Sequence, residues 1–244
     1  MRDDYREHLA EFAHNLIVMC DSIKEMASHA SRALLSADLT SAEDVLTSVE
    51  DVEELRVKCE QQAFQLLALE SPVARDLRRV ISGTYIVEDL SRMSALMVHI
   101  AKVARRRHPD CAVPDSMVPY FSEMAKQCLD ITATLHDVLV SYDPELALQL
   151  ARDDDAIDDL HHHIFVLTTQ REWPYTTTNA VDVTLLSRYY ERYSDHAVQI
   201  GARVIYLATG MRPEEYVGGR DERDREATFT RHFDEIQQRY GGAF

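Results

Sequence analysis

The sequence predicts an all-α protein built as two tandem antiparallel three-helix bundles that arise from an internal repeat. Apolar residues recur every three or four positions along most of the chain, which is the spacing of one face of an α-helix. Residues 90–100 and 190–200 share Arg, Ser, Val and Ile in register, which indicates a duplicated helical unit. Only 7 of the 244 residues are Gly and 7 are Pro, as is typical of a helix-rich protein.

Residues 1–108 form the first predicted repeat. Thr40-x-x-Glu43 has the pattern of a capping box and predicts the start of the second helix. Ser71-Pro72 predicts the start of the third helix, and Arg105-Arg106-Arg107 ends it, because cations complement the dipole at a helix C-terminus. The apolar stripes of these three helices cover residues 9–33, 45–66 and 77–100.

Residues 114–212 form the second predicted repeat, and the segment from His108-Pro109 to Pro114 is the predicted boundary. Asp143-Pro144 predicts the start of the fifth helix, and Gly210 predicts the end of the sixth. The apolar stripes cover residues 121–142, 146–167 and 183–207. Residues 213–244 carry many charges of both signs, so we expect a flexible tail there.

The composition argues against several classes of partner. The formal net charge is −16, whereas direct binding to nucleic acid or anionic lipid requires basic patches. No uninterrupted apolar run approaches the roughly 20 residues of a membrane span, and the first residues contain no apolar signal core. The four cysteines are scattered without a CxxC spacing, which fits a reduced compartment. We therefore expect a cytoplasmic protein with no direct membrane insertion.

A carboxylate pair distinguishes the second repeat from the first. Glu191 and Asp195 stand four residues apart and share one face of the predicted sixth helix. Two carboxylates about 6 Å apart repel each other by roughly 3 kcal/mol at an effective dielectric constant near 20. A nearby arginine, water or a metal ion should offset this repulsion, and the flanking Arg188 and Arg192 are the purely structural explanation.

Two further acidic pairs have the same spacing. Because hard oxygen ligands suit Mg, Mn or Fe, three such pairs raise the prospect of bound metal, and the candidate ions are Fe, Zn, Mg or Mn. The predicted metal ligands are Glu191, Asp195, Asp154, Asp158, Glu50 and Glu54. The alternative is a structural adaptor whose acidic pairs are merely solvated.

The sequence offers little support for an enzyme. Three consecutive histidines, 161–163, point in three directions on a helix, so at most one is expected to join the carboxylates. His136-Asp137 raises an all-helical metal phosphohydrolase as an alternative, but that class needs several converging histidines. No Gly-rich phosphate loop and no nucleophile with an adjacent base stands out. We therefore predict a protein without catalytic activity and with no catalytic residues.

Two segments resemble the PhoU family of phosphate-signalling proteins. Residues 191–200, Glu-Arg-Tyr-Ser-Asp-His-Ala-Val-Gln-Ile, resemble the family signature ERIGDHAxNI. Residues 71–78, Ser-Pro-Val-Ala-Arg-Asp-Leu-Arg, resemble its QPxAxDLR motif with Ser71 in place of Gln. The resemblance covers roughly residues 1–212. It implies a cytoplasmic negative regulator that restrains a sensor histidine kinase and acts beside the ATPase of a phosphate ABC transporter, with a homodimer as the expected assembly.

The same resemblance implies metal binding through E/D-x-x-x-D motifs. Glu191 with Asp195, and Asp154 with Asp158, match these motifs on the sixth and fifth helices. In the first repeat, Ser91 and Ala95 replace the expected third-helix acids, and Glu50 and Glu54 match one position out of register. Any metal site is therefore expected mainly in the second repeat. A metal-binding helical scaffold with another role is the remaining alternative.

Overall fold

The computed structural model describes residues 2–70, 72–170 and 172–219. Within these ranges the chain forms six long α-helices, one short 3₁₀ helix and a short helical stretch at residues 213–219, with no β-strand, so the all-α prediction is confirmed. The elements are α1 (Arg2–Ser36), α2 (Leu39–Glu70), α3 (Arg75–Arg107), η1 (Asp115–Met117), α4 (Val118–Ser141), α5 (Pro144–Thr169) and α6 (Thr177–Thr209).

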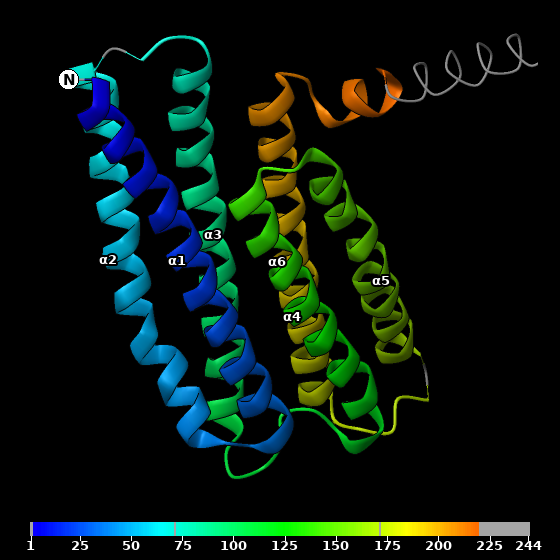
Figure 1. Ribbon diagram of the computed structural model, residues 1–244. Coiled ribbons are helices and arrows are strands. Elements are labelled where there is room, and N and C mark those ends of the chain that lie inside the picture. Colours follow the sequence, from blue (N-terminus) through cyan, green and yellow to red (C-terminus); the bar gives the residue numbers. More distant parts are fainter. Residues whose placement is uncertain (1, 71, 171, 220–244) are drawn as a thin grey trace, which may run out of the picture.

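The helices form two antiparallel three-helix bundles that lie side by side (Figure 1). The first bundle contains α1–α3 and the second contains α4–α6. The bundles meet through α3 against α6 and through α1 against α4. This arrangement leaves α2 and α5 on the two outer flanks, each packed on helices of its own bundle.

The internal repeat is visible in the pattern of buried side chains. Equivalent buried positions lie 112 residues apart in α1 and α4, 105 apart in α2 and α5, and 100 apart in α3 and α6. Representative pairs are Leu9 with Phe121, Val52 with Ile157, and Met93 with Tyr193. Because buried positions dictate which way each helix faces, the two bundles present corresponding faces to each other and to solvent.

Equivalent positions meet at the centre of the molecule. Cys20 of α1 and Thr132 of α4 are equivalent, and the Cys20 Sγ lies 4.0 Å from the Thr132 carbonyl oxygen. Next to them, the fully buried Tyr193 hydroxyl lies 2.7 Å from Thr132 Oγ1. The hydroxyl of Tyr190, also fully buried, lies 2.9 Å from Ser31 Oγ. These contacts bind α6 to both α1 and α4.

Polar and aromatic contacts join α3 to α6 along most of their length. Residue numbers rise along α3 as they fall along α6 in these contacts, so the two helices are antiparallel. The pairs are Tyr85 with Arg203, Asp89 with His196, His99 with Tyr189, and Arg107 with Asp182.

Two of the predicted helix starts are wrong. Asp38, and not Thr40, caps α2, because its carboxylate accepts hydrogen bonds from the backbone amides of Thr40 and Ser41 and so replaces the predicted capping box. The helix α3 begins at Arg75, later than predicted; Ser71 lies outside the described residues. In contrast, Asp143 caps α5, as the sequence predicts.

The helix α6 ends where the sequence predicts, but the first residues after it differ from the predicted flexible tail. Gly210 ends α6 in the left-handed conformation, with a φ of 77°, as expected for a C-terminal glycine. Residues 213–219 of the predicted flexible tail are helical, and residues 220–244 lie outside the described residues. Among the helices described, none is long and apolar enough to cross a membrane.

The buried Asp182 carboxylate provides a test of how strongly the bundles are joined. It accepts hydrogen bonds from Arg107 at 2.6 Å and Arg106 at 3.1 Å, across the boundary between the bundles. We expect Asp182→Ala to lower the free energy of unfolding by about 2 kcal/mol, because it removes charge-assisted hydrogen bonds. Urea denaturation measures this change. Glu43→Ala is the control, since the Glu43 pair with Arg105 is exposed and 3.4 Å long. Equal losses in both variants would contradict the prediction.

Candidate functional site: an acidic cluster between α5 and α6

Four predicted metal ligands come together between α5 and α6 in the second bundle. Asp154 and Asp158 stand one turn apart on α5, and Glu191 and Asp195 stand one turn apart on α6. The charge of Asp195 raises the pKa of each of the other three carboxyl groups, so all four lie within electrostatic reach. We call these four residues the acidic cluster.

Burial and mutual repulsion make these carboxyl groups harder to ionise. Burial is the main cause that raises the pKa of Glu191 to about 7, and Asp195 raises it further, while Arg188 opposes both. The pKa of Asp154 rises to about 6, mainly through burial, and the Ser194 hydroxyl opposes this increase. Burial and Asp195 likewise raise the pKa of Asp158. The cluster thus holds negative charge that the local environment disfavours.

The flanking arginines satisfy only part of this charge. Arg188 donates a hydrogen bond to Oε1 of Glu191, and Arg192 Nε lies 3.9 Å from Asp195 Oδ2. One buried oxygen of the cluster, Glu191 Oε2, has no hydrogen-bond partner among the described residues. Buried polar atoms of this kind call for an explanation, and a bound ion or water is a common one.

The chemistry of the donors fits a hard divalent cation. Carboxylate oxygens suit Mg²⁺, Mn²⁺ and Fe²⁺ better than Zn²⁺, which prefers Cys and His ligands. Among the residues that the structure describes, however, no three His, Cys, Asp or Glu side chains lie close enough together to hold a metal ion. The cluster is therefore a set of candidate ligands on adjacent helices and not a finished coordination sphere.

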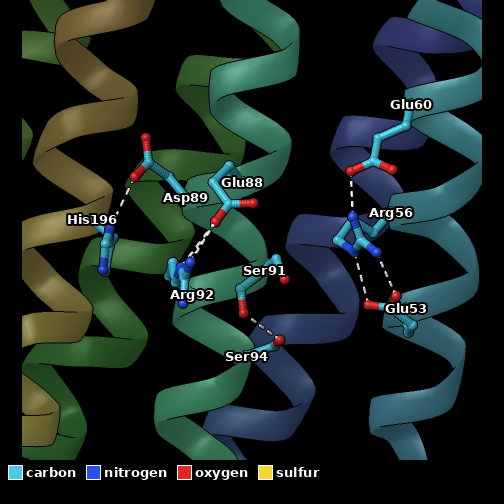
Figure 2. A network of polar contacts seen from close by, with 9 residues as sticks. All are labelled: Glu53, Arg56, Glu60, Glu88, Asp89, Ser91, Arg92, Ser94 and His196. Atoms are coloured by element: carbon cyan, nitrogen blue, oxygen red, sulfur yellow. Dashed lines mark hydrogen bonds and ion pairs between the residues drawn. The ribbon is translucent and has the colours of Figure 1, made fainter.

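The first bundle carries a different set of side chains at the equivalent positions. Ser91 and Ala95 occupy the places of Glu191 and Asp195 on α3, and Val49 and Glu53 occupy the places of Asp154 and Asp158 on α2. Figure 2 shows that the acids present nearby are paired with arginines. The pairs are Glu53 with Arg56 at 2.6 Å, Glu60 with Arg56, and Glu88 with Arg92 at 2.9 Å. Each of these three acids thus has an arginine partner on its own helix, whereas the acidic cluster holds four carboxyl groups.

Glu50 and Glu54 do not join the acidic cluster. Both lie exposed on α2, which packs on α1 and α3 of the other bundle. By the 105-residue offset they correspond to Asp155 and Asp159, which are also exposed. Metal binding by Glu50 and Glu54 therefore stays a prediction, separate from the cluster.

The histidines that the sequence left ambiguous have distinct positions. His161 is half-buried on α5, and its Nδ1 lies 2.9 Å from the buried Ser187 hydroxyl. Its pKa is lowered mainly by burial and by Arg188, while Asp158 opposes the change, so it lies beside the cluster. His162 and His163 are exposed. Only His161 of the three is thus near the carboxylates.

His196, the neighbour of Asp195 in sequence, serves the contact between the bundles. Its Nδ1 lies 3.0 Å from Asp89 Oδ1 of α3, with both side chains largely buried (Figure 2). His136, the basis of the phosphohydrolase alternative, pairs with Asp21 at 3.6 Å and Asp137 at 3.3 Å. Sequence reasoning did not assign Ser187, Ser194 or Asp89, since local spacing gives no sign of their partners on other helices.

The fold and the cluster define a class of all-helical tandem-repeat proteins with a cluster of carboxyl groups on the second repeat. Residues 16–104 and 121–204 match the PhoU domain. The chain therefore belongs to the PhoU family.

Curated relatives and solved structures agree with this assignment. The chain is 46% identical over 213 residues to phosphate-specific transport system accessory protein PhoU homolog 2 of Mycobacterium tuberculosis, covering 87% of this chain and 100% of the relative. It is 44% identical to PhoU homolog 1 of Mycobacterium leprae, covering 88% and 97%. The crystal structure of PhoU from Pseudomonas aeruginosa superimposes with a TM-score of 0.78 at 24% identity, covering 85% and 100%, which shows the shared fold.

The raised pKa values predict how stability depends on pH. Between the ordinary pKa of a carboxyl group and about 7, the folded chain binds more protons than the unfolded chain, so the free energy of unfolding should fall as the pH rises. We expect Glu191→Gln to make this fall smaller, because the amide cannot ionise. Urea denaturation in chelator-containing buffer between about pH 5 and about pH 8 measures it. Glu50→Gln, an exposed matched change, should leave the profile unaltered; identical profiles for both variants would contradict the prediction.

Proposed function

We propose that this chain is an accessory protein of a phosphate-specific transport system and a negative regulator of phosphate-starvation signalling. The observation that carries the proposal is the 46% identity over the whole length of a relative named as such an accessory protein. In this role the chain restrains a sensor histidine kinase and binds the ATPase of the phosphate ABC transporter when phosphate is plentiful. It acts by binding and not by catalysis.

The charge of the chain supports docking to proteins. A formal net charge of −16 favours partners with basic surfaces and speeds their encounter with the acidic faces of the bundles. Two exposed apolar pairs at equivalent positions on α3 and α6, Ile81 with Tyr85 and Val181 with Leu185, add contact area on both bundles. A homodimer is part of this proposal.

We further propose that the acidic cluster binds a divalent cation as part of this role. Glu191, Asp195, Asp154 and Asp158 would supply the oxygen ligands, and the unpaired Oε2 of Glu191 supports this assignment. A cation would offset the repulsion among these groups and could thereby strengthen the contact between α5 and α6. The ion is Mg, Mn or Fe in preference to Zn, on the basis of the donor atoms.

Loss of the α6 carboxylates should lower metal binding. We expect the double variant Glu191→Ala/Asp195→Ala to bind at least tenfold less Mn²⁺ than the unmodified chain, measured by the loss of the electron paramagnetic resonance signal of free Mn²⁺. The matched control is Glu50→Ala/Glu54→Ala, which removes two exposed carboxylates of the same spacing in the first bundle. Unchanged Mn²⁺ binding in the α6 variant would contradict the assignment of the site to the acidic cluster. Loss of Mn²⁺ binding in the control alone would indicate that the ion binds to α2.

Complementation tests the regulatory role. Expressed in a mycobacterial host that lacks its own PhoU proteins, the chain should restore repression of phosphate-starvation genes in high phosphate, measured with a promoter reporter. The metal-site double variant, expressed at the same level, reports whether repression needs the cluster. Persistent reporter output with soluble, abundant unmodified protein would contradict the regulatory proposal and favour a helical scaffold with another role.

A further inference from the structure

A cavity of about 340 Å³ lies at the end of the molecule where α1 and α3 begin and α4 and α6 end. This is the upper end in Figure 1, whereas the acidic cluster lies about halfway along α5 and α6. The walls of the cavity are apolar and come from both bundles. They include Leu9, Phe12 and Leu16 of α1, Ile86 of α3 and Leu207 of α6, all of which are buried.

Two arginines stand beside this apolar space. Arg6 of α1 and Arg79 of α3 line the cavity, and among the described residues that line it there is no Asp or Glu. Neither arginine forms an ion pair with an acid among the residues that the structure describes. In a chain with 42 acidic and 26 basic residues, two arginines without an acidic partner next to an apolar cavity form a distinct positive site.

Local backbone features shape the cavity. Tyr142, the residue after α4, has a φ of 53° in the left-handed region, and its side chain lines the cavity. Burial raises the pKa of Tyr142 and Arg79 opposes this, so the guanidinium lies close to the phenol. Gly83 lets α3 approach α1 closely, since a Cβ there would lie 2.3 Å from Cε1 of Phe12. The ring of Phe12 therefore packs directly against α3 and forms one wall.

We propose that this cavity binds a small amphiphilic anion, with an alkyl chain among the apolar walls and a carboxylate held by Arg6 and Arg79. The volume falls within the range of about 300–1,000 Å³ that is typical of ligand pockets. Guanidinium groups bind carboxylates through paired hydrogen bonds, and those of Arg6 and Arg79 are the charged groups that the described part of the cavity wall presents.

The occupant is a free medium-chain fatty acid and not a membrane lipid. One cavity of this volume accepts a single short alkyl chain, whereas a bilayer phospholipid carries two long ones. The net charge of −16 also opposes close approach to an anionic membrane surface.

Displacement of a fluorescent fatty acid tests this proposal on the full chain. Dansylaminoundecanoic acid is bound first and then displaced by dodecanoate, dodecanol or dodecylammonium, all below their micellar concentrations. We expect dodecanoate to displace the probe at a concentration at least tenfold below that of dodecanol, because only the anion meets the arginines. Dodecylammonium should be the weakest competitor.

Variants separate the charged contact from the apolar one. Arg79→Gln should raise the displacing concentration of dodecanoate at least fivefold and leave that of dodecanol unchanged. Arg92→Gln is the control, since Arg92 lies further along α3 and pairs with Glu88. Ala13→Phe, which fills the half-buried lining position of α1, should abolish probe binding. Circular dichroism checks that each variant folds. If Ala13→Phe does not fold, the displacement measurements on Arg79→Gln still test the proposal.

Three results would overturn the proposal. The first is no saturable probe binding, and the second is equal displacement by dodecanoate and dodecanol, which would indicate unspecific adsorption to apolar surface. The third is binding to anionic phospholipid vesicles together with no binding of monomeric dodecanoate, which would identify a membrane contact instead.

Discussion

The placement of α6 depends on two tyrosine hydroxyls buried where the bundles meet. Tyr190 and Tyr193 are fully buried, and each hydroxyl has one partner, Ser31 of α1 and Thr132 of α4 respectively. A buried phenol without a partner would cost free energy, so these two bonds favour one rotation and one register of α6 against both neighbours. Glu191 directly follows Tyr190 and therefore lies at the edge of the core, facing α5.

The same scaffold thus carries different charged side chains at equivalent places in its two bundles. In the first bundle, arginines on α2 and α3 pair with Glu53, Glu60 and Glu88. In the second, Arg188 and Arg192 pair with Glu191 and Asp195, the two acids that α6 contributes to the acidic cluster. Because the two bundles bury equivalent positions, the difference in charge comes from the types of side chain and not from the fold. The three acids of the first bundle have arginine partners on their own helices, whereas burial and mutual repulsion raise the pKa of Asp154, Asp158 and Glu191 in the second.

Local spacing predicted the helices and the partners that lie on one helix, but not the contacts between helices. The three-to-four residue periodicity located all six long helices, and the four-residue spacing placed Glu191 with Asp195 on one face. That these two meet Asp154 and Asp158 depends on how α5 and α6 rotate about their axes, which only packing decides. Capping failed at Thr40 because Asp38 competed for the same amides. No local sequence pattern predicts the pairing of Asp89 with His196, because these residues are 107 positions apart in the chain.

The acidic cluster and the contact between the bundles are physically linked through α6. Asp195 faces the acidic cluster, while its neighbour His196 is held by Asp89 of the other bundle. Any rotation of α6 that moved Asp195 away from the other carboxylates would also stretch this ion pair and disturb the tyrosine hydroxyl bonds. The core therefore holds the carboxylates close together in spite of their repulsion.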